Sequence, residues 1–281
     1  MRHLSLLLLC VSWVSCSTAR SVESVGNELA QVTSQFLATL DDTQRELASQ
    51  KVDDSEAVAW HFVPGRYAGI EMGALNAQQR SAAHQVLRTM LSATGFAKAM
   101  AIADLENVLH KLESKPNKPA THRDPDRYAL LISGTPSPGG TYVVRYQGHH
   151  VSLRMVVVNG MLAAHTPHFF GTNPHIVPAE FARPAVLHAE ESRARELLNT
   201  FNAADLQKAM IAADAPADVL LGPGKTPSEI GPRCGLAWNE MSELSHHALW
   251  FLLEVHVNSL RSDVAAAELE RIYSNRSEIS F

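Results

Sequence analysis

The sequence has little of what builds disulfide frameworks or nucleic-acid-binding surfaces. Only one of its three cysteines, Cys234, lies beyond the first 16 residues, so a disulfide-stapled scaffold is excluded. The 24 Lys and Arg are outnumbered by 29 Asp and Glu, which leaves no basic excess to hold nucleic acid. With 46% hydrophobic and 19% charged residues, the composition is that of a globular chain and not of a polytopic membrane protein.

Several common catalytic signatures are also missing from the chain. It contains no Gly-x-Ser-x-Gly elbow, no His-Glu-x-x-His helix, no phosphate-binding loop that ends in Lys-Ser/Thr, and no paired-cysteine zinc motif. Any chemistry must therefore come from a less common constellation of side chains.

The first residues have the pattern of an export signal. A basic start is followed by the apolar run 4–14 and by the small residues Ser17 and Ala19. The run is too short to span a bilayer. We therefore predict a signal peptide over residues 1–19, cleaved near Ala19, and a secreted or periplasmic protein. Lipid anchoring through Cys16 is the less favoured alternative.

Hydrophobic periodicity predicts an α+β fold in which an antiparallel β-meander packs against helices before and after it in sequence. The predicted helices cover residues 25–50, 77–94, 97–113, 187–213, 236–260 and 263–273. The predicted strands cover residues 57–67, 128–133, 141–147, 150–158 and 161–169. No internal repeat is present, so residues 20–281 are predicted to form a single domain.

Asn159-Gly160 fixes the register of one hairpin in this meander. Asn-Gly favours a two-residue turn because both central positions need positive φ, so Val158 should pair with Met161. Counting outward places Arg154 opposite His165 and Val151 opposite His168. Alternation then turns one face of the strand toward the core, namely Val151, Leu153, Met155 and Val157.

Histidine is the unusual component of the meander. Five of the 14 histidines fall in or just after it, namely His149, His150, His165, His168 and His175. A neutral imidazole suits a transition metal or acid–base work near neutral pH, and the predicted register puts His149 about 7 Å from His168. The alternative is that these residues are hydrogen-bonded fillers of a sheet edge. No Asp or Glu lies between Tyr128 and Val177, so a carboxylate partner must come from elsewhere in the fold.

Two segments carry a family resemblance. Residues 148–153, Gly-His-His-Val-Ser-Leu, and residues 166–174, Thr-Pro-His-Phe-Phe-Gly-Thr-Asn-Pro, resemble the DUF3500 family of largely secreted proteins without an established function. The resemblance runs from about Trp60 to Phe281. It implies that His149 and His150 are site residues, with Asn173 in the following loop. It also implies that the family pattern continues past Phe281, so we expect a C-terminal part to be missing.

Two hypotheses about function follow. In the first, the chain is a secreted metal-dependent, hydrolase-like enzyme that binds a divalent transition metal such as zinc through His149, His150 and His168. His149 or His150 then serves as ligand or acid–base group, Arg154 orients an anionic substrate, and Asn173 contacts the ligand. In the second, the chain is a non-catalytic binding or structural module whose histidine pair is a buried corner. Either way we expect a small-molecule or polymer ligand, no nucleic acid and no membrane span.

Overall fold

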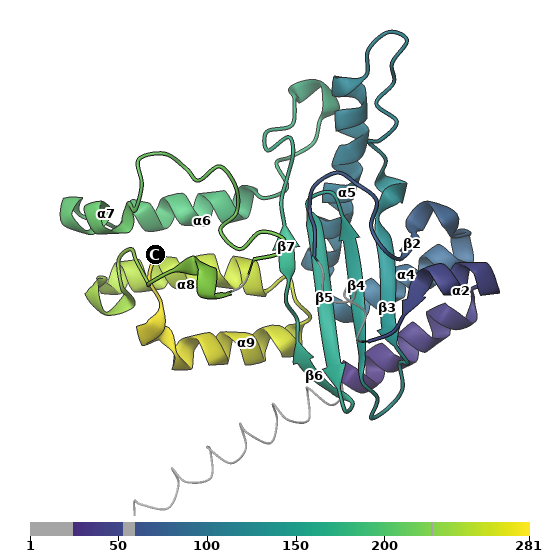
Figure 1. Ribbon diagram of the computed structural model, residues 1–281. Coiled ribbons are helices and arrows are strands. Elements are labelled where there is room, and N and C mark those ends of the chain that lie inside the picture. The colour runs from purple at the N-terminus through teal and green to yellow at the C-terminus, as the bar shows by residue number, and fades with distance from the viewer. Residues whose placement is uncertain (1–24, 53–59, 226) are drawn as a thin grey trace, which may run out of the picture.

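The computed structural model describes residues 25–52, 60–225 and 227–281. Within these residues one mixed sheet runs in the order β1-β3-β4-β5-β6, with β2 also paired to β3 and β7 to β5. In Figure 1 one group of helices covers the back of this sheet, and α6 to α9 form a separate layer beside the β6 and β7 edge. The signal peptide predicted over residues 1–19 lies outside the described residues.

The strands confirm the predicted antiparallel meander. Its members are β3 (Ala129–Gly134), β4 (Tyr142–Gly148), β5 (Val151–Val158) and β6 (Met161–Ala164). Three short strands extend it, namely β1 (Ser49–Gln50), β2 (Ile70–Glu71) and β7 (His168–Phe170). Only β1 is parallel to its neighbour, β3. The α+β class predicted from the sequence is therefore correct.

Helices precede and follow the sheet. Residues 25–38 are helical, and then come α2 (Asp42–Ala48), α4 (Ala77–Met90), α5 (Ala93–Glu113), α6 (His188–Leu198), α7 (Ala203–Ala209), α8 (Glu243–Val257) and α9 (Ser262–Ser274). Among the described residues, no helix is both long and apolar enough to cross a membrane.

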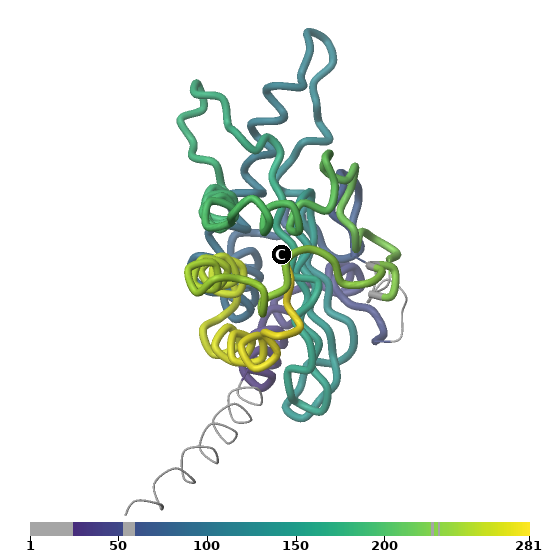
Figure 2. The backbone as a smooth tube through the Cα atoms, turned by 90° about the vertical axis from the view of Figure 1, so that its left-hand side faces the viewer, coloured from purple at the N-terminus to yellow at the C-terminus, as the bar shows by residue number. Residues whose placement is uncertain are grey.

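Two large hydrophobic clusters hold these layers, and a small third one joins Leu105 and Val108 of α5 to Val177 in the loop after β7. The largest one joins the helix at 25–38, α4 and α5 to one face of the sheet, where Val151, Leu153, Met155 and Val157 are buried as alternation predicts. The second lies among α6, α8 and the segment before α8, around Leu197, Leu236, Trp238, Met241, Leu249 and Leu252. Seen from the side in Figure 2, these C-terminal helices stack next to the sheet.

Local side-chain caps explain where the long helices begin. Asn76 and Gln79 form a reciprocal capping box at the start of α4, at 3.0 and 2.9 Å. The helix predicted over 77–94 ends at Met90. Gly95 lies in the first turn of α5, where a Cβ would come within 2.0 Å of the Ser259 carbonyl oxygen. The glycine is there for close packing, so α5 starts earlier than predicted.

Other predicted boundaries were also wrong. The helix predicted over 25–50 is interrupted before Asp41, which caps α2, and the helix predicted over 187–213 is interrupted before Asn202, which caps α7. Each cap side chain accepts backbone N–H bonds that begin a new helix. The short strand and turn predicted within 57–67 do not include a strand over residues 60–67, and residues 57–59 lie outside the described residues.

The Asn159-Gly160 hairpin is confirmed, but its register does not persist. Val158 pairs with Met161 and Val157 with Leu162, as predicted. A β-bulge between Val156 and Val157 then shifts the pairing, and in β7 His168 lies opposite Leu153 instead of Val151. Two residues of displacement move His168 about 7 Å along the strand, away from His149.

Gly148 provides a test of how tightly the upper end of the meander is packed. A Cβ at this position would lie 2.0 Å from the ring of Tyr128, which is only 1% exposed. We expect Gly148→Ala to destabilise the protein by about 2 kcal/mol or more and to lower Tm by roughly 5 °C or more, measured by thermal unfolding. Gly222→Ala is the control, since its nearest atom would be 3.5 Å away. A Gly148→Ala variant that melts like the control would contradict this packing.

Candidate functional site

The Gly-His-His segment is the tight turn between β4 and β5. Gly148 pairs with Val151, so His149 and His150 are the two turn residues, and β5 does not begin at His150 as predicted. His150 has φ of 62°, a left-handed conformation that the second position of this turn requires. The sequence pattern therefore marks a hairpin turn with a histidine at both central positions.

Backbone hydrogen bonds fix this turn from three sides. The Tyr128 hydroxyl donates to the carbonyl oxygen of His149 at 2.5 Å. The His150 N–H donates to Phe62, and the Gly171 N–H donates to the carbonyl of His150, both at 2.8 Å. Burial of the Tyr128 ring raises the pKa of its hydroxyl well above the usual value, so this donor keeps its proton. The turn is thus held independently of the histidine side chains.

A buried carboxylate from α5 contacts the first histidine. Glu106 Oε1 lies 2.5 Å from Nδ1 of His149, and the two residues are 3% and 8% exposed. A buried carboxylate needs a charged or hydrogen-bonding partner, which the imidazole supplies. Glu106 comes from α5, outside the meander, as expected for an acidic partner of these histidines.

The proton on this imidazole can be assigned from its neighbours. Arg123 Nη1 lies 3.3 Å from the same Nδ1, but a guanidinium only donates. Because Nδ1 faces the carboxylate at the shorter distance, it carries the proton and donates to Glu106, so the Arg123 contact is not a hydrogen bond. When the ring is neutral, Nε2 of His149 is therefore the unprotonated nitrogen, and it makes no hydrogen bond to another described residue.

Arg123 lies near both Glu106 and a second carboxylate, Glu113. Its Nε and Nη2 donate to the two carboxylate oxygens of Glu113, at 2.9 and 2.8 Å, and its Nη1 lies 3.9 Å from Glu106. The hydrogen bond from Arg123 lowers the pKa of Glu113, and Glu113 raises the pKa of the guanidinium. Arg123 thus neutralises part of the negative charge next to His149.

His150 has a different environment. Its ring lies against that of His149, with centroids 4.0 Å apart and ring planes tilted by 50°, and a Cβ on Gly171 would lie 2.6 Å from its Nδ1. Burial, helped by His149 and Arg123, lowers the pKa of His150 to about 4. At neutral pH this imidazole is uncharged, and it packs the turn against the loop after β7.

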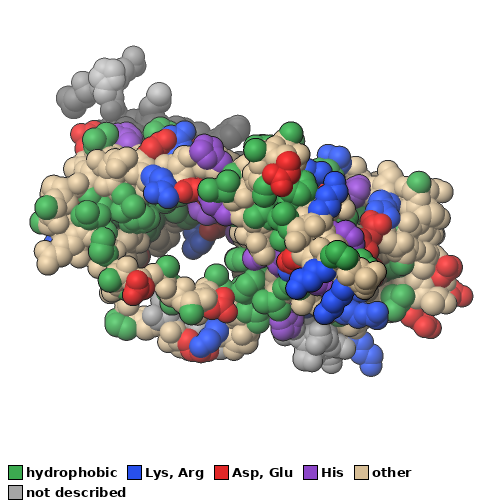
Figure 3. Space-filling view, turned by 90° about the horizontal axis from the view of Figure 1, so that it is seen from above, with side chains coloured by type: hydrophobic (Ala, Val, Ile, Leu, Met, Phe, Trp, Pro, Cys, Tyr) green, Lys and Arg blue, Asp and Glu red, His purple; other side chains and the backbone are tan. Residues whose placement is uncertain are grey.

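A small pocket opens beside His149. It is lined by Pro64, Gly65, Tyr67, Glu106, His122, Asp124, Arg127, Tyr128 and His149. The cavity volume of about 10 Å³ is near the size of one water molecule. Figure 3 looks onto this end of the molecule and shows histidine side chains interspersed with acidic and basic ones. The pocket therefore combines a basic nitrogen with room for water.

The predicted metal ligands are not brought together. Nε2 of His168 is 2.6 Å from the hydroxyl of Ser259, on the segment between α8 and α9, and the bulge separates His168 from the His149 turn. Nδ1 of His149 is used by Glu106. Within the described part of the chain, no group of three or more His, Cys, Asp or Glu side chains is arranged to hold a metal ion. The donor set present does not fit the predicted zinc site.

The remaining predicted site residues lie outside the pocket. Arg154 donates through Nε to the carbonyl of Thr166 at 2.7 Å, so it braces the segment after β6. Asn173 is exposed in the loop after β7 and does not line the pocket beside His149. Glu106, Arg123 and Arg127 were missed, because nothing in their local sequence distinguishes them from ordinary helix and loop residues.

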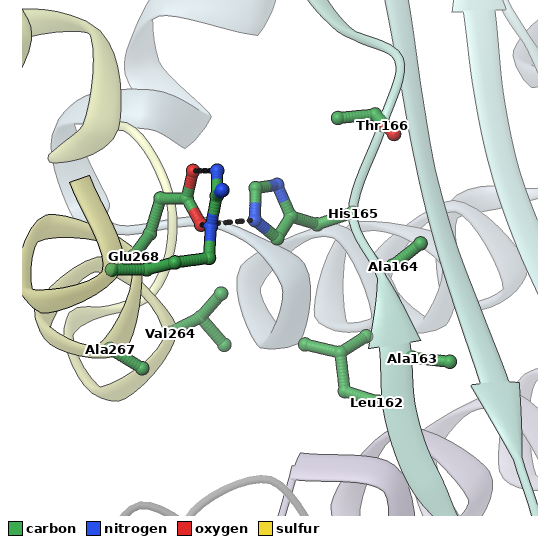
Figure 4. A pocket seen from close by; sticks show the side chains of 9 residues that line it. Leu162, Ala163, Ala164, His165, Thr166, Val264, Ala267 and Glu268 are labelled. Atoms are coloured by element: carbon green, nitrogen blue, oxygen red, sulfur yellow. Dashed lines mark hydrogen bonds and ion pairs between the residues drawn. The ribbon is translucent and has the colours of Figure 1, made fainter. Parts of the chain in front are cut away.

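A second cavity lies around His165. It has a volume of about 360 Å³ between β6 and α9, and Figure 4 shows His165 and Glu268 facing each other across it. Nε2 of His165 is 3.5 Å from Glu268, whose pKa is lowered first by hydrogen bonds from Arg271. The walls of this cavity are mainly aliphatic. The β-bulge shifts the pairing of β6, so His165 does not lie opposite Arg154 as predicted.

Comparison with known proteins identifies the family. The model of the DUF3500 family, described as a protein of unknown function, matches residues 23–281, and the chain belongs to this family. The match covers more of the N-terminal part than the resemblance seen from about Trp60. No curated protein and no solved structure matches the chain.

His168 makes the folded state sensitive to acid. Burial, followed by the charges of His165, Lys98 and His256, lowers the pKa of His168 to about 3. The unfolded chain takes up this proton near pH 6.5 but the folded chain does not, so stability is lost as pH falls from about 6.5 toward 3. We expect His168→Gln to reduce the slope of unfolding free energy against pH by about 1 kcal/mol per pH unit between pH 6 and 4.

Urea unfolding at several pH values measures this slope. Comparing slopes removes any pH-independent loss of stability that the substitution itself causes. His61→Gln, at an exposed position, is the control. Equal slopes for wild type and His168→Gln would show that His168 is not held neutral by the fold.

Proposed function

We propose that the protein is a hydrolase-like enzyme whose general base is His149, oriented by Glu106. The observation that carries the proposal is the 2.5 Å contact between Nδ1 of His149 and the buried carboxylate, beside a water-sized pocket. In the neutral ring this contact leaves Nε2 without a proton. A carboxylate that fixes the tautomer of a histidine is how many enzymes prepare an imidazole to take a proton.

The chemistry follows from this arrangement. Nε2 of His149 takes a proton from water, and the resulting hydroxide adds to the electrophilic centre of an ester-like substrate. The protonated imidazole then returns the proton to the departing oxygen, so the substrate bond is cleaved and water is consumed. Glu106 stays ionised and stabilises the imidazolium. His150, held neutral by burial, packs the turn and takes no proton in this scheme.

The structural alternative also rests on a specific observation. The backbone of the turn is tied to Tyr128, Phe62 and Gly171, which is what a corner between sheet and loops needs. Those bonds involve backbone atoms of His149 and His150, so they account for the turn without requiring the imidazole of His149. The buried Glu106 contact is what the structural alternative leaves unexplained.

A panel of chromogenic carboxylic esters, phosphate monoesters and glycosides tests the proposed activity. We expect His149→Gln and Glu106→Gln each to lower kcat/KM on the hydrolysed substrate by roughly 10²- to 10⁴-fold, because each removes the oriented base. His175→Gln is the matched control, since His175 contacts Glu191 at the same 2.5 Å on the exposed surface. It should leave the rate within about twofold of wild type.

Thermal unfolding of the same variants separates the two functions. Glutamine at position 149 can still donate to Glu106, so the catalytic proposal expects folding to survive with little change in Tm. The structural alternative expects His149→Gln/His150→Gln to lower Tm by several degrees without any effect on catalysis. Variants that hydrolyse the panel as fast as wild type would contradict the enzyme proposal.

We propose that this enzyme works outside the cytoplasm. The support is the basic, apolar and small-residue order of residues 1–19, which lie outside the described structure. N-terminal sequencing of the protein recovered from its native host should begin near Arg20, and a mature chain that retains Met1 would contradict export by cleavage.

A further inference from the structure

Arg127 is a basic residue that lines the pocket beside His149 and has no role in the proposed mechanism. It ends the short 3-10 helix Pro125–Arg127 and lines the pocket together with His122 and Asp124. Its guanidinium forms no hydrogen bond or ion pair with any residue that the structure describes. Arg123, by contrast, is bound to both oxygens of Glu113.

An arginine with no acidic partner among the described residues, beside a candidate base, can serve as an anchor for an oxyanion. A planar guanidinium can donate two parallel N–H···O hydrogen bonds to a carboxylate or a phosphate, and arginine remains charged at physiological pH. Neither of the two carboxylates that line the pocket forms an ion pair with Arg127. Glu106 faces His149, and Asp124 accepts the backbone N–H of Asp126 at 2.8 Å as a helix cap.

We infer that Arg127 binds an anionic group of the substrate, so the protein acts on a small molecule that carries a carboxylate or a phosphate. The inference rests on the proposed function and assigns its substrate class. Because the cavity itself holds about one water molecule, the anion lies outside it, against the half-buried side chain of Arg127. Glu106 and Asp124 line the same pocket, and two carboxylates there disfavour a dianion. A carboxylate is therefore expected to bind more tightly than inorganic phosphate at neutral pH. Arg127 replaces Arg154, which the structure places on Thr166, as the residue that orients the anion.

Titration of the whole protein with acetate and with inorganic phosphate tests this inference without turnover. The readout is the NMR signal of the Arg127 Nε–H and of the Gly65 amide, both at the pocket. We expect saturable shifts with acetate and a roughly millimolar Kd for so small an anion. Phosphate should bind several-fold more weakly. Arg127→Gln should weaken acetate binding, read at Gly65, by about tenfold or more.

Two further variants make the result specific. Arg195→Gln removes the same charge from an exposed position on α6, where Arg195 contacts Glu191, and should bind acetate within about twofold of wild type. Arg127→Lys keeps the positive charge but loses the planar pair of N–H donors, so this variant should bind acetate with intermediate affinity. It also serves if Arg127→Gln does not fold, as judged by circular dichroism.

The outcomes separate this inference from the proposed function. Acetate that binds wild type and Arg127→Gln equally, or that gives no saturable shift at Arg127, overturns the anchor. Acetate binding that depends on Arg127, in a protein whose His149→Gln variant hydrolyses the panel as fast as wild type, keeps the anchor and overturns the base. Phosphate that binds more tightly than acetate overturns the preference for a carboxylate.

Discussion

The hydrogen bond between the imidazole of His149 and the carboxylate of Glu106 is the constraint on which the site depends. It joins the middle of α5 to the β4–β5 turn, two elements far apart in the sequence, in a region where both side chains are buried. Charge-assisted bonds of this kind contribute about 1.5–3 kcal/mol, and an unpaired carboxylate there would cost more than that. The same bond fixes the tautomer of His149 in a turn whose backbone is already held by other hydrogen bonds.

The three residues of the Gly-His-His turn have separate physical roles. Gly148 lets the backbone approach the ring of Tyr128, where any side chain would collide. His150 adopts the left-handed conformation that closes the turn and packs as a neutral ring against His149 and the loop after β7. Only His149 combines a buried acidic partner with a free ring nitrogen. The two histidines of the motif are therefore not equivalent: one contacts a buried carboxylate, and the other packs the turn.

The meander could be predicted from the sequence because its signals are local, whereas the site depends on contacts between distant segments. Alternation and the Asn159-Gly160 turn are local signals, and they placed Val157 opposite Leu162 correctly. The bulge after Val157 has no such signal, and it displaced His168 from the histidine pair and removed the basis for a shared metal. Glu106 lies 43 residues from His149 in the chain, so only the packing of α5 on the sheet could reveal that contact.

The most direct test of this account is the protonation state of the His149 ring, read from its two ¹⁵N chemical shifts in long-range ¹H–¹⁵N NMR spectra at neutral pH. The account predicts a protonated Nδ1 and an unprotonated Nε2, and a loss of this single-tautomer pattern in Glu106→Gln. A proton on Nε2 with a bare Nδ1, or a ring unaffected by Glu106→Gln, would contradict the claim that the buried carboxylate prepares His149 as a base.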